Sequence, residues 1–272
     1  MKRDQSELKI AFNGAGSMAE AIIRGLIEKG VMKPQQIFAL NNSNTKRLES
    51  LKSRYGIHAS NEPATKVDYL KSADIIVMAM KPKDAAAAFQ YLGTVIPDDV
   101  MLVSVIAGMS ISTMQELLQR RIPIVRTMPN TSSTIGLGAT GVSYSGSVTS
   151  EQQELARTLF QAIGIVAEVE EPMLETVTGV SGSGPAYVYY FIEAMVKAGV
   201  EGGLSPESAL ELTVQTVLGA AQMVKHTMED PAVLRKKGDF SRWNHPGRYR
   251  KAGCLPVYRG NCTSGIPCSR EV

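Results

Sequence analysis

Cysteine and tryptophan are scarce in this chain. Its three cysteines (Cys254, Cys262 and Cys268) and its only tryptophan (Trp243) all lie after position 237 of the 272 residues. Successive cysteines are eight and six positions apart, whereas the paired ligands of a zinc site are usually about two to four residues apart. The sequence therefore predicts neither a disulfide framework nor a metal centre.

Long apolar runs are lacking as well. The most apolar candidate for a membrane span, residues 186–200, contains Glu193 and Lys197, so no spanning helix is predicted. The charged start of the chain, residues 1–7, is not followed by the apolar core of a signal peptide. With 44% hydrophobic residues, the chain can bury the core of one large domain or two ordinary ones. We expect a cytoplasmic protein with no membrane partner.

Positive charge is concentrated at the C-terminal end. Six of the 29 Lys and Arg residues but only two of the 26 Asp and Glu residues lie from Gly238 onward, so residues 1–237 carry 23 basic and 24 acidic groups. The scattered cations of this tail lack the ordered aromatics of a nucleic-acid site, and no nucleic-acid partner is predicted. The tail is rich in Gly and Pro without helical periodicity, so we expect residues 238–272 to be disordered.

Strand-like and helix-like segments alternate along the first part of the chain. Continuous apolar runs such as residues 74–80 are typical of strands covered on both faces, and the alternation predicts a Rossmann-type doubly wound sheet between layers of helices. The strand pattern stops near Glu170, and two helices follow. We expect an α/β domain over residues 1–169 and an all-α domain over residues 170–237.

The expected elements are these. Strands are expected at residues 8–12, 36–40, 57–59, 74–80, 100–106, 123–126, 139–143 and 164–168, and helices at 18–29, 45–54, 112–118, 151–162, 186–197 and 208–226. Ser150 is a good N-cap for the helix 151–162, and Leu204-Ser205-Pro206-Glu207 reads as a cap and first turn.

Glycine and small residues follow the first expected strand in the order Gly14-Ala15-Gly16-Ser17-Met18-Ala19. In this G-x-G-x-x-A pattern, Gly14 permits a tight turn, Gly16 lets a pyrophosphate approach the backbone, and Ala19 lets the helix pack on the strand. Because a strand precedes the loop and a helix follows it, the pattern predicts a dinucleotide site. A glycine-rich turn of another α/β fold is the alternative.

The end of the second strand has no carboxylate, although NAD sites usually place one there to bind the ribose 2′-hydroxyl. Residues 41–47 instead read Asn-Asn-Ser-Asn-Thr-Lys-Arg. Amide and hydroxyl groups followed by Lys46 and Arg47 suit a 2′-phosphate, so the predicted cofactor is NADP (NADPH), with NAD as the alternative. The other interpretation is that both cations are solvated residues on a helix surface.

Three further loops follow expected strands, at residues 79–82, 107–109 and 128–131. Ligands of open α/β sheets bind beyond the carboxyl ends of the strands. We therefore expect these loops to complete the rim of the cofactor site.

A run of small residues, Ser181-Gly182-Ser183-Gly184-Pro185, leads into an apolar segment that begins near Tyr187. Serine caps helices, and proline is tolerated in the first turn. The run therefore predicts the exposed N-terminus of a long buried helix, a place suited to a carboxylate or another anion. The alternative is a tight loop that only starts a core helix.

Together these stretches resemble the pyrroline-5-carboxylate reductase family. The resemblance runs from about Ile10 to Lys237 and rests on residues 14–19, 80–82, 104–108, 126–131, 219–221 and, most specifically, 181–187. It implies a Rossmann domain followed by a helical domain that interlocks with a second subunit, in a homodimer or a larger homo-oligomer. It also implies NAD(P)H-dependent reduction of 1-pyrroline-5-carboxylate to L-proline, the last step of proline biosynthesis.

The resemblance also implies which residues form the site. The turn made of Ser181, Gly182, Ser183, Gly184 and Pro185 is expected to help form the substrate pocket beside the nicotinamide. The residues expected at the cofactor are Gly14, Ala15, Gly16, Ser17, Met18, Asn41, Ser43, Asn61, Ala79, Met80, Lys81, Pro82, Ala107 and Gly108. An iminium carbon accepts hydride readily, so positioning should dominate the chemistry, and no catalytic side chain is assigned.

The chain departs from the family pattern at Asn42, where the family often has arginine, and after Lys237. There the family continues Val-Thr-Ser-Pro-Gly-Gly-Thr-Thr and a final helix, whereas this chain reads Gly-Asp-Phe-Ser-Arg-Trp-Asn-His. Back-translated residues 238–249, read one nucleotide later, can encode the family motif, with the fully determined codon GGA on a family glycine. We therefore hypothesise a frameshift at Lys237/Gly238, in the gene or in its sequencing.

Two other functions stay open at this point. A β-hydroxyacid dehydrogenase of similar architecture would need a catalytic lysine on a helix of the second domain, and Lys197 is the only early candidate. A non-catalytic dinucleotide-binding protein would result if the altered tail removes the family's substrate loop.

Overall fold

The computed structural model describes residues 7–238. The chain divides into two compact units, and the division falls between Pro185 and Ala186. The predictions made for residues 239–272 lie outside the described residues.

A single eight-stranded sheet forms the centre of the first unit, with the strand order β3-β2-β1-β4-β5-β6-β7-β8. Neighbouring strands are parallel, except that β7 runs antiparallel to β6. From β1 the chain moves outward to β2 and β3 and then crosses to β4, which is the predicted doubly wound topology. The strands are β1 (Ile10–Asn13), β2 (Ile37–Leu40), β3 (His58–Ser60), β4 (Ile75–Met78), β5 (Met101–Ser104), β6 (Ile124–Met128), β7 (Gly138–Tyr144) and β8 (Gly164–Glu168).

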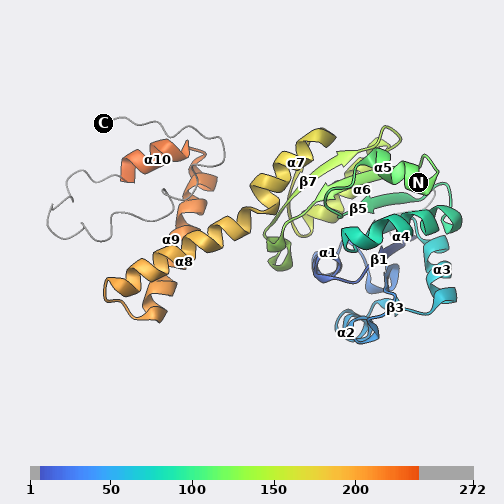
Figure 1. Ribbon diagram of the computed structural model, residues 1–272, viewed down its shortest axis with the longest axis horizontal. Coiled ribbons are helices and arrows are strands. Elements are labelled where there is room, and N and C mark those ends of the chain that lie inside the picture. The colour runs from blue at the N-terminus through green and yellow to red at the C-terminus, as the bar shows by residue number, and fades with distance from the viewer. Residues whose placement is uncertain (1–6, 239–272) are drawn as a thin grey trace. The chain divides into compact units, whose positions relative to one another are not determined.

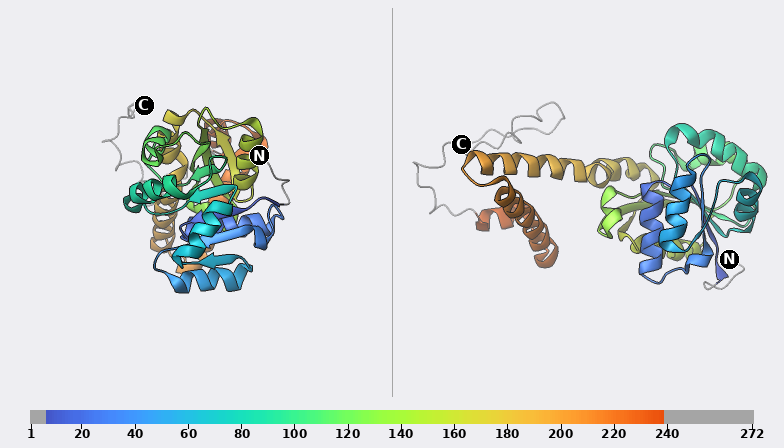
Figure 2. Two further views of the ribbon diagram at one scale, coloured as in Figure 1. Left: turned by 90° about the vertical axis from the view of Figure 1, so that its right-hand side faces the viewer. Right: turned by 90° about the horizontal axis from the view of Figure 1, so that it is seen from below.

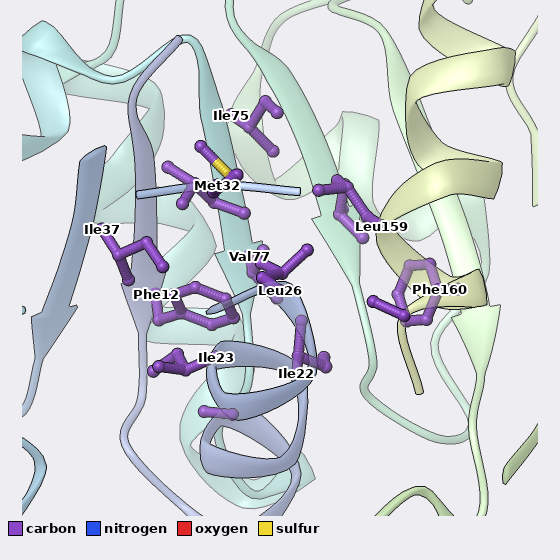
Figure 3. Packing of buried hydrophobic residues seen from close by; sticks show 14 of the residues in the cluster. Phe12, Ile22, Ile23, Leu26, Met32, Ile37, Ile75, Val77, Leu159 and Phe160 are labelled. Carbon is purple, nitrogen blue, oxygen red and sulfur yellow. The ribbon is translucent and has the colours of Figure 1, made fainter. Parts of the chain in front are cut away.

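Helices cover both faces of this sheet (Figures 1 and 2). One apolar cluster joins the sheet to α1 and α6 (Figure 3) and also to α2. A second cluster joins the sheet to α3, α4 and α5. The helices are α1 (Ser17–Glu28), α2 (Thr45–Tyr55), α3 (Pro63–Ser72), α4 (Pro82–Val95), α5 (Ile111–Leu118), α6 (Ser150–Gln161) and α7 (Leu174–Val177). Shorter turns are η2 (Pro34–Gln36), η3 (Thr131–Ile135), η4 (Glu171–Met173) and η5 (Thr178–Gly182).

The two clusters follow from the alternation of side chains along each strand. In β1, Ile10 and Phe12 belong to the first cluster and Ala11 to the second. Every residue of β2, β4 and β5 is buried. Strands covered on both faces need apolar residues at both parities, which explains why the sequence shows continuous apolar runs here.

The second unit contains the remainder of α8 (Gly184–Glu201), together with α9 (Pro206–Thr227) and α10 (Pro231–Gly238). Ser205 is the N-cap of α9 and accepts a hydrogen bond from Ser208 N at 3.2 Å, as predicted for this turn. Near the turn between α8 and α9, a Cβ added to Gly199 would lie 3.1 Å from that of Ala209. The two helices therefore approach closely at this point.

The structure corrects two local predictions. The N-cap of α6 is Thr149 rather than Ser150, because the Thr149 side chain accepts from Gln152 N and Gln152 reciprocates as a capping box. The helix after Pro185 was expected to be buried, but no side chain of α8 is buried in this single chain. Among the described residues, no helix is both long and apolar enough to cross a membrane.

Three helices of the first unit were not predicted, namely α3, α4 and the four-residue α7. Both α3 and α4 begin with a proline, Pro63 and Pro82, at the first helical position. Proline at that position is a helix-start signal. The boundaries proposed for the domains, 1–169, 170–237 and 238–272, stay predictions.

Candidate functional site

The carboxyl ends of the parallel strands bring the predicted cofactor residues to one edge of the sheet. Residues 14–18 follow β1, Asn41 and Ser43 follow β2, and Asn61 follows β3. Residues 79–82 follow β4, and residues 107–108 follow β5. Since β3, β2, β1, β4 and β5 are successive neighbours in the sheet, these five loops line a continuous edge. This is the edge at which doubly wound sheets bind ligands.

Two glycines of the first loop have different structural tasks. Gly14 has φ +114°, and a Cβ on it would lie 2.3 Å from the carbonyl oxygen of Ala79. Its N–H donates to Leu40 O at 3.0 Å, so the turn is bonded to the end of β2 and lies close against the end of β4. By contrast, a Cβ on Gly16 would meet nothing within 4 Å. Gly14 is therefore required by the fold, whereas Gly16 leaves space above the loop.

The N-terminus of α1 opens into that space. Gly16 is its N-cap residue and provides no side-chain hydrogen bond to the first turn. The unpaired N–H groups at a helix start, together with the helix dipole, favour an anion. The open position at Gly16 and the uncapped start of α1 thus fit the pyrophosphate of a dinucleotide.

Arg47 braces the glycine loop from α2. Its Nε donates to Ala15 O at 2.9 Å, and its Nη2 lies 2.5 Å from a carboxylate oxygen of Glu20. Glu20 also accepts from Arg54 at 2.7 Å and from the Tyr55 hydroxyl at 3.0 Å. The sequence pattern left two interpretations of Arg47, a ligand of a 2′-phosphate or a solvated residue on the helix surface. In the structure its guanidinium is held by the loop and by Glu20.

The surroundings of Glu20 favour its ionised form. Its partial burial opposes ionisation, but the hydrogen bonds from Arg47 and Tyr55 and the charges of Arg47 and Arg54 outweigh that effect. The pKa of Glu20 is therefore held below its ordinary value. Sequence reasoning missed Glu20, because its partners lie 27 to 35 positions away.

The loop after β2 is shaped by its own asparagines. Asn41 Oδ1 accepts from Ser43 N at 3.2 Å and from Asn44 N at 3.3 Å. Asn44 is the N-cap of α2 and accepts from Arg47 N at 3.0 Å. The Asn42 side chain accepts a hydrogen bond from Lys66 Nζ, which comes from α3. A cation thus reaches this loop from a neighbouring element.

The Ser-Gly-Ser-Gly-Pro run lies at a helix start, as the sequence predicted, because α8 begins at Gly184. The start is not free, however, because a π-helical turn precedes it. Residues 178–182 form a π-helical turn between α7 and α8, and Ser183 N donates to Thr178 O at 2.8 Å. The Ser181 hydroxyl donates to Val177 O at 3.1 Å instead of capping a helix. Helical hydrogen bonding therefore reaches Ser183, directly before the start of α8. Single π-helical turns inside α-helices are frequent at functional sites.

The turn is fastened to the same edge of the sheet as the glycine loop. Asn130, which follows β6, donates from Nδ2 to Ser181 O at 3.1 Å and accepts from Ala139 N at 3.2 Å. A Cβ on Gly182 would lie 3.0 Å from the Met128 methyl group. The loop at 128–131, expected at the cofactor rim, thus supports the predicted substrate turn.

A buried arginine adds a second attachment. Arg126 of β6 is 8% exposed, and its guanidinium nitrogens lie 3.1 Å from Glu171 and 2.9 Å from Glu175. Glu171 also accepts from Ile111 N at 2.7 Å. These contacts hold η4 and α7, the elements that lead into the π-helical turn, against the sheet.

Two family models match the chain. The model described as pyrroline-5-carboxylate reductase dimerisation matches residues 171–239. The model described as NADP oxidoreductase, coenzyme F420-dependent, matches residues 9–108.

Whole-chain similarity points the same way. Pyrroline-5-carboxylate reductase 2 of Bacillus subtilis is 42% identical over 229 residues, which are 84% of this chain and 81% of the relative. The solved structure of a pyrroline-5-carboxylate reductase from Coxiella burnetii has a TM-score of 0.80 and 32% identity, covering 94% of this chain and 91% of that one. The Plasmodium falciparum pyrroline carboxylate reductase, solved with NADP bound, has a TM-score of 0.76 and 28% identity. The match covers 86% of this chain and 85% of that one. The fold, the motifs and the extent of these matches agree, and the chain belongs to the pyrroline-5-carboxylate reductase family.

Proposed function

We propose that this protein reduces 1-pyrroline-5-carboxylate to L-proline with NADPH, the last step of proline biosynthesis, in the cytoplasm. The observation that carries the proposal is the hydrogen bond between Asn130 and Ser181, which fastens the π-helical turn to the sheet edge that bears the open glycine loop. The glycine loop and the π-helical turn are therefore both held at the same edge of the sheet.

The chain's own residues act mainly by positioning. Gly16 and the start of α1 would hold the pyrophosphate, and the loops at 41–43, 79–82 and 107–108 would hold the remainder of the cofactor. When bound, NADPH supplies the hydride that adds to the C=N carbon. The turn at 181–185 would orient the imino acid, whose nitrogen keeps a proton as the carbon is reduced. Orientation of two bound reactants accounts for much of the rate of such a step.

We also propose a homodimer, or a larger homo-oligomer built from it. On α8, Tyr187 and Tyr190 are each 61% exposed, and on α9, Leu212 is 58% exposed. In the first unit, an apolar hollow of about 410 Å³ lies over β7, β8 and α7. Exposed apolar surface of this extent marks an interaction site, and the dimerisation model covers residues 171–239. Light scattering on a size-exclusion column tests this, and a monomer at micromolar concentration would refute it.

The sequence change at Gly238 bears on activity. By family resemblance, the motif expected there contributes to the substrate site, and the dimerisation match ends at residue 239. We propose that a frameshift has replaced the motif. The chain as written is then expected to bind NADPH but to reduce pyrroline-5-carboxylate much more slowly than a frame-restored chain.

One experiment separates the functions. NADPH oxidation is followed with pyrroline-5-carboxylate for the chain as written and for the frame-restored chain, with proline identified as the product. Turnover in the restored chain supports the proposal. Cofactor binding without turnover in both chains would indicate a non-catalytic dinucleotide-binding protein, and turnover only with a 3-hydroxy acid would indicate a β-hydroxyacid dehydrogenase. Resequencing the gene around codon 237 tests the frameshift, and an unchanged reading frame would refute it.

A further inference from the structure

Most polar groups at the end of β2 are already committed to the shape of their loop. Asn41 Oδ1 accepts from two backbone N–H groups of the loop, and Asn44 caps α2. The nearest arginines, Arg47 and Arg54, both pair with Glu20. Their charges are partly cancelled by that carboxylate, and Arg47 is also tied to the glycine loop. The positive charge for a phosphate beyond β2 would then come from a lysine, either Lys46 at the start of α2 or one on a neighbouring element.

Lys66 is placed to supply that cation. It lies in the first turns of α3, and its ammonium group donates to Asn42 Oδ1, 24 positions away in the sequence. Because β2 and β3 are parallel and Leu40 pairs with Ser60, the loops that follow them lie at the same edge. Among residues 7–238, the one side-chain hydrogen bond of Lys66 is to this neutral amide. Its charge is therefore not neutralised by a carboxylate.

The nearby carboxylate of Glu62 binds backbone N–H groups instead of Lys66. Glu62 is the N-cap of α3, and its Oε2 accepts from Ala64 N at 2.8 Å and from Thr65 N at 3.3 Å. The Glu62 carboxylate thus neutralises the start of α3 rather than Lys66. The Lys66–Asn42 pair leaves a positive, donor-rich position beyond the end of β2, where a doubly wound sheet places the adenosine ribose.

We propose that Lys66, together with Asn42 and Ser43, binds the 2′-phosphate of NADPH and determines the preference of this chain for NADPH over NADH. The inference rests on the proposed function, because it assumes that the site holds a nicotinamide dinucleotide. An ammonium group binds phosphate as a compact charge with three donors, and the Asn42 amide and Ser43 hydroxyl supply neutral donors beside it. This assignment moves the phosphate contact from Lys46 and Arg47 on α2 to Lys66 on α3.

The test uses two ligands that differ only in the 2′-phosphate, namely adenosine 2′,5′-bisphosphate and 5′-AMP. Calorimetry on the full chain is expected to show that Lys66→Met lowers the affinity for the bisphosphate about tenfold or more, because charge-assisted hydrogen bonds are among the stronger ones. The affinity for 5′-AMP is expected to stay unchanged. Lys66→Arg restores most of the affinity. Lys46→Met, which removes an exposed lysine at the start of α2, is the matched control and has little effect.

Two results would overturn the assignment. One is an equal loss for both ligands in Lys66→Met, which would mean general damage to the site. The other is a selective loss in Lys46→Met and not in Lys66→Met. If the unaltered chain binds neither ligand, nor NADPH by nicotinamide fluorescence, the proposed function itself fails. If it binds NADPH and NADH equally and Lys66→Met changes nothing, only the assignment of Lys66 fails.

Discussion

The side-chain amide of Asn130 donates a 3.1 Å hydrogen bond to the backbone carbonyl of Ser181. The donor follows β6, and the acceptor belongs to the π-helical turn, 51 positions later. The same side chain accepts from Ala139 N at the start of β7. Asn130 is 8% exposed, so it connects strand β6, strand β7 and the turn in a site largely shielded from water.

Replacing Asn130 with alanine should harm substrate binding more than cofactor binding. The change leaves Ser181 O and Ala139 N without their partner, and an unsatisfied buried group costs about 1–3 kcal/mol. In the frame-restored chain, we expect kcat/KM for pyrroline-5-carboxylate to fall about tenfold, mainly through KM, with the Kd for NADPH unchanged. Steady-state kinetics and nicotinamide fluorescence measure the two quantities.

Asn130→Asp is the informative companion variant. It keeps an acceptor for Ala139 N but cannot donate to Ser181 O, and it brings an acid close to the carbonyl. We expect it to impair turnover at least as much as Asn130→Ala. Equal losses in NADPH affinity and in KM for either variant would contradict a specific link between Asn130 and the turn.

The sequence was sufficient to predict those parts of the site whose residues lie close together in the chain. The glycine loop could be predicted because the strand, the turn and the helix follow one another within residues 10–28. The positions of Arg47 and Lys66 could not, because their contacts with Glu20 and Asn42 depend on the packing of α1, α2 and α3. At Ser181 the sequence was sufficient only in part. Ser, Gly and Pro correctly marked the start of α8 at Gly184, but they gave no sign of the π-helical turn that precedes it.

The two glycines of the first loop should respond differently to alanine. Gly14→Ala forces a side chain into a positive φ and against Ala79 O at 2.3 Å, so we expect lower stability by about 1–2 kcal/mol from the backbone alone, and more from the clash. Gly16→Ala meets no neighbour and has φ −74°, so the thermal midpoint should hardly change. Its methyl group would occupy the space for the pyrophosphate, and NADPH affinity should fall strongly.

Thermal unfolding and NADPH titration of the two variants distinguish these effects. The expected pattern is a stability loss for Gly14→Ala and a binding loss at normal stability for Gly16→Ala. If Gly16→Ala binds NADPH as the unaltered chain does, the start of α1 is not the pyrophosphate site.

Glu20→Gln should reduce stability in a pH-dependent way. The folded protein holds the pKa of Glu20 below its ordinary value of 4.5. The carboxylate therefore stabilises the fold at pH values above the pKa that Glu20 has in the unfolded chain. This contribution is lost as the pH falls through the folded-state pKa. We expect Glu20→Gln to have a lower Tm than the unaltered chain at neutral pH, with the difference shrinking below about pH 4.5.

A matched control is available on the same helix. Glu28 pairs with Arg24 at 3.7 Å and its side chain is 66% exposed, and exposed pairs contribute at most about 1 kcal/mol and often nothing. Glu28→Gln should therefore leave Tm nearly unchanged across the same pH range. A difference for Glu20→Gln that is constant from pH 7 to about pH 3 would show that the loss has a steric origin rather than an electrostatic one.

Asn42→Asp should reverse the cofactor preference. The substitution places a carboxylate after β2, the arrangement by which NAD sites bind the ribose 2′-hydroxyl. The new carboxylate would pair with the Lys66 ammonium, which already donates to this side chain, and would repel a 2′-phosphate. We expect NADPH affinity to fall at least about tenfold, a change of about 1.4 kcal/mol, while NADH affinity is kept or improves.

Combining Asn42→Asp with Lys66→Met should add little further loss for NADPH, because both changes remove the same positive position. Fluorescence titration of both nucleotides for the single and double variants measures this coupling, and fully additive losses would show that Asn42 and Lys66 act on the cofactor independently.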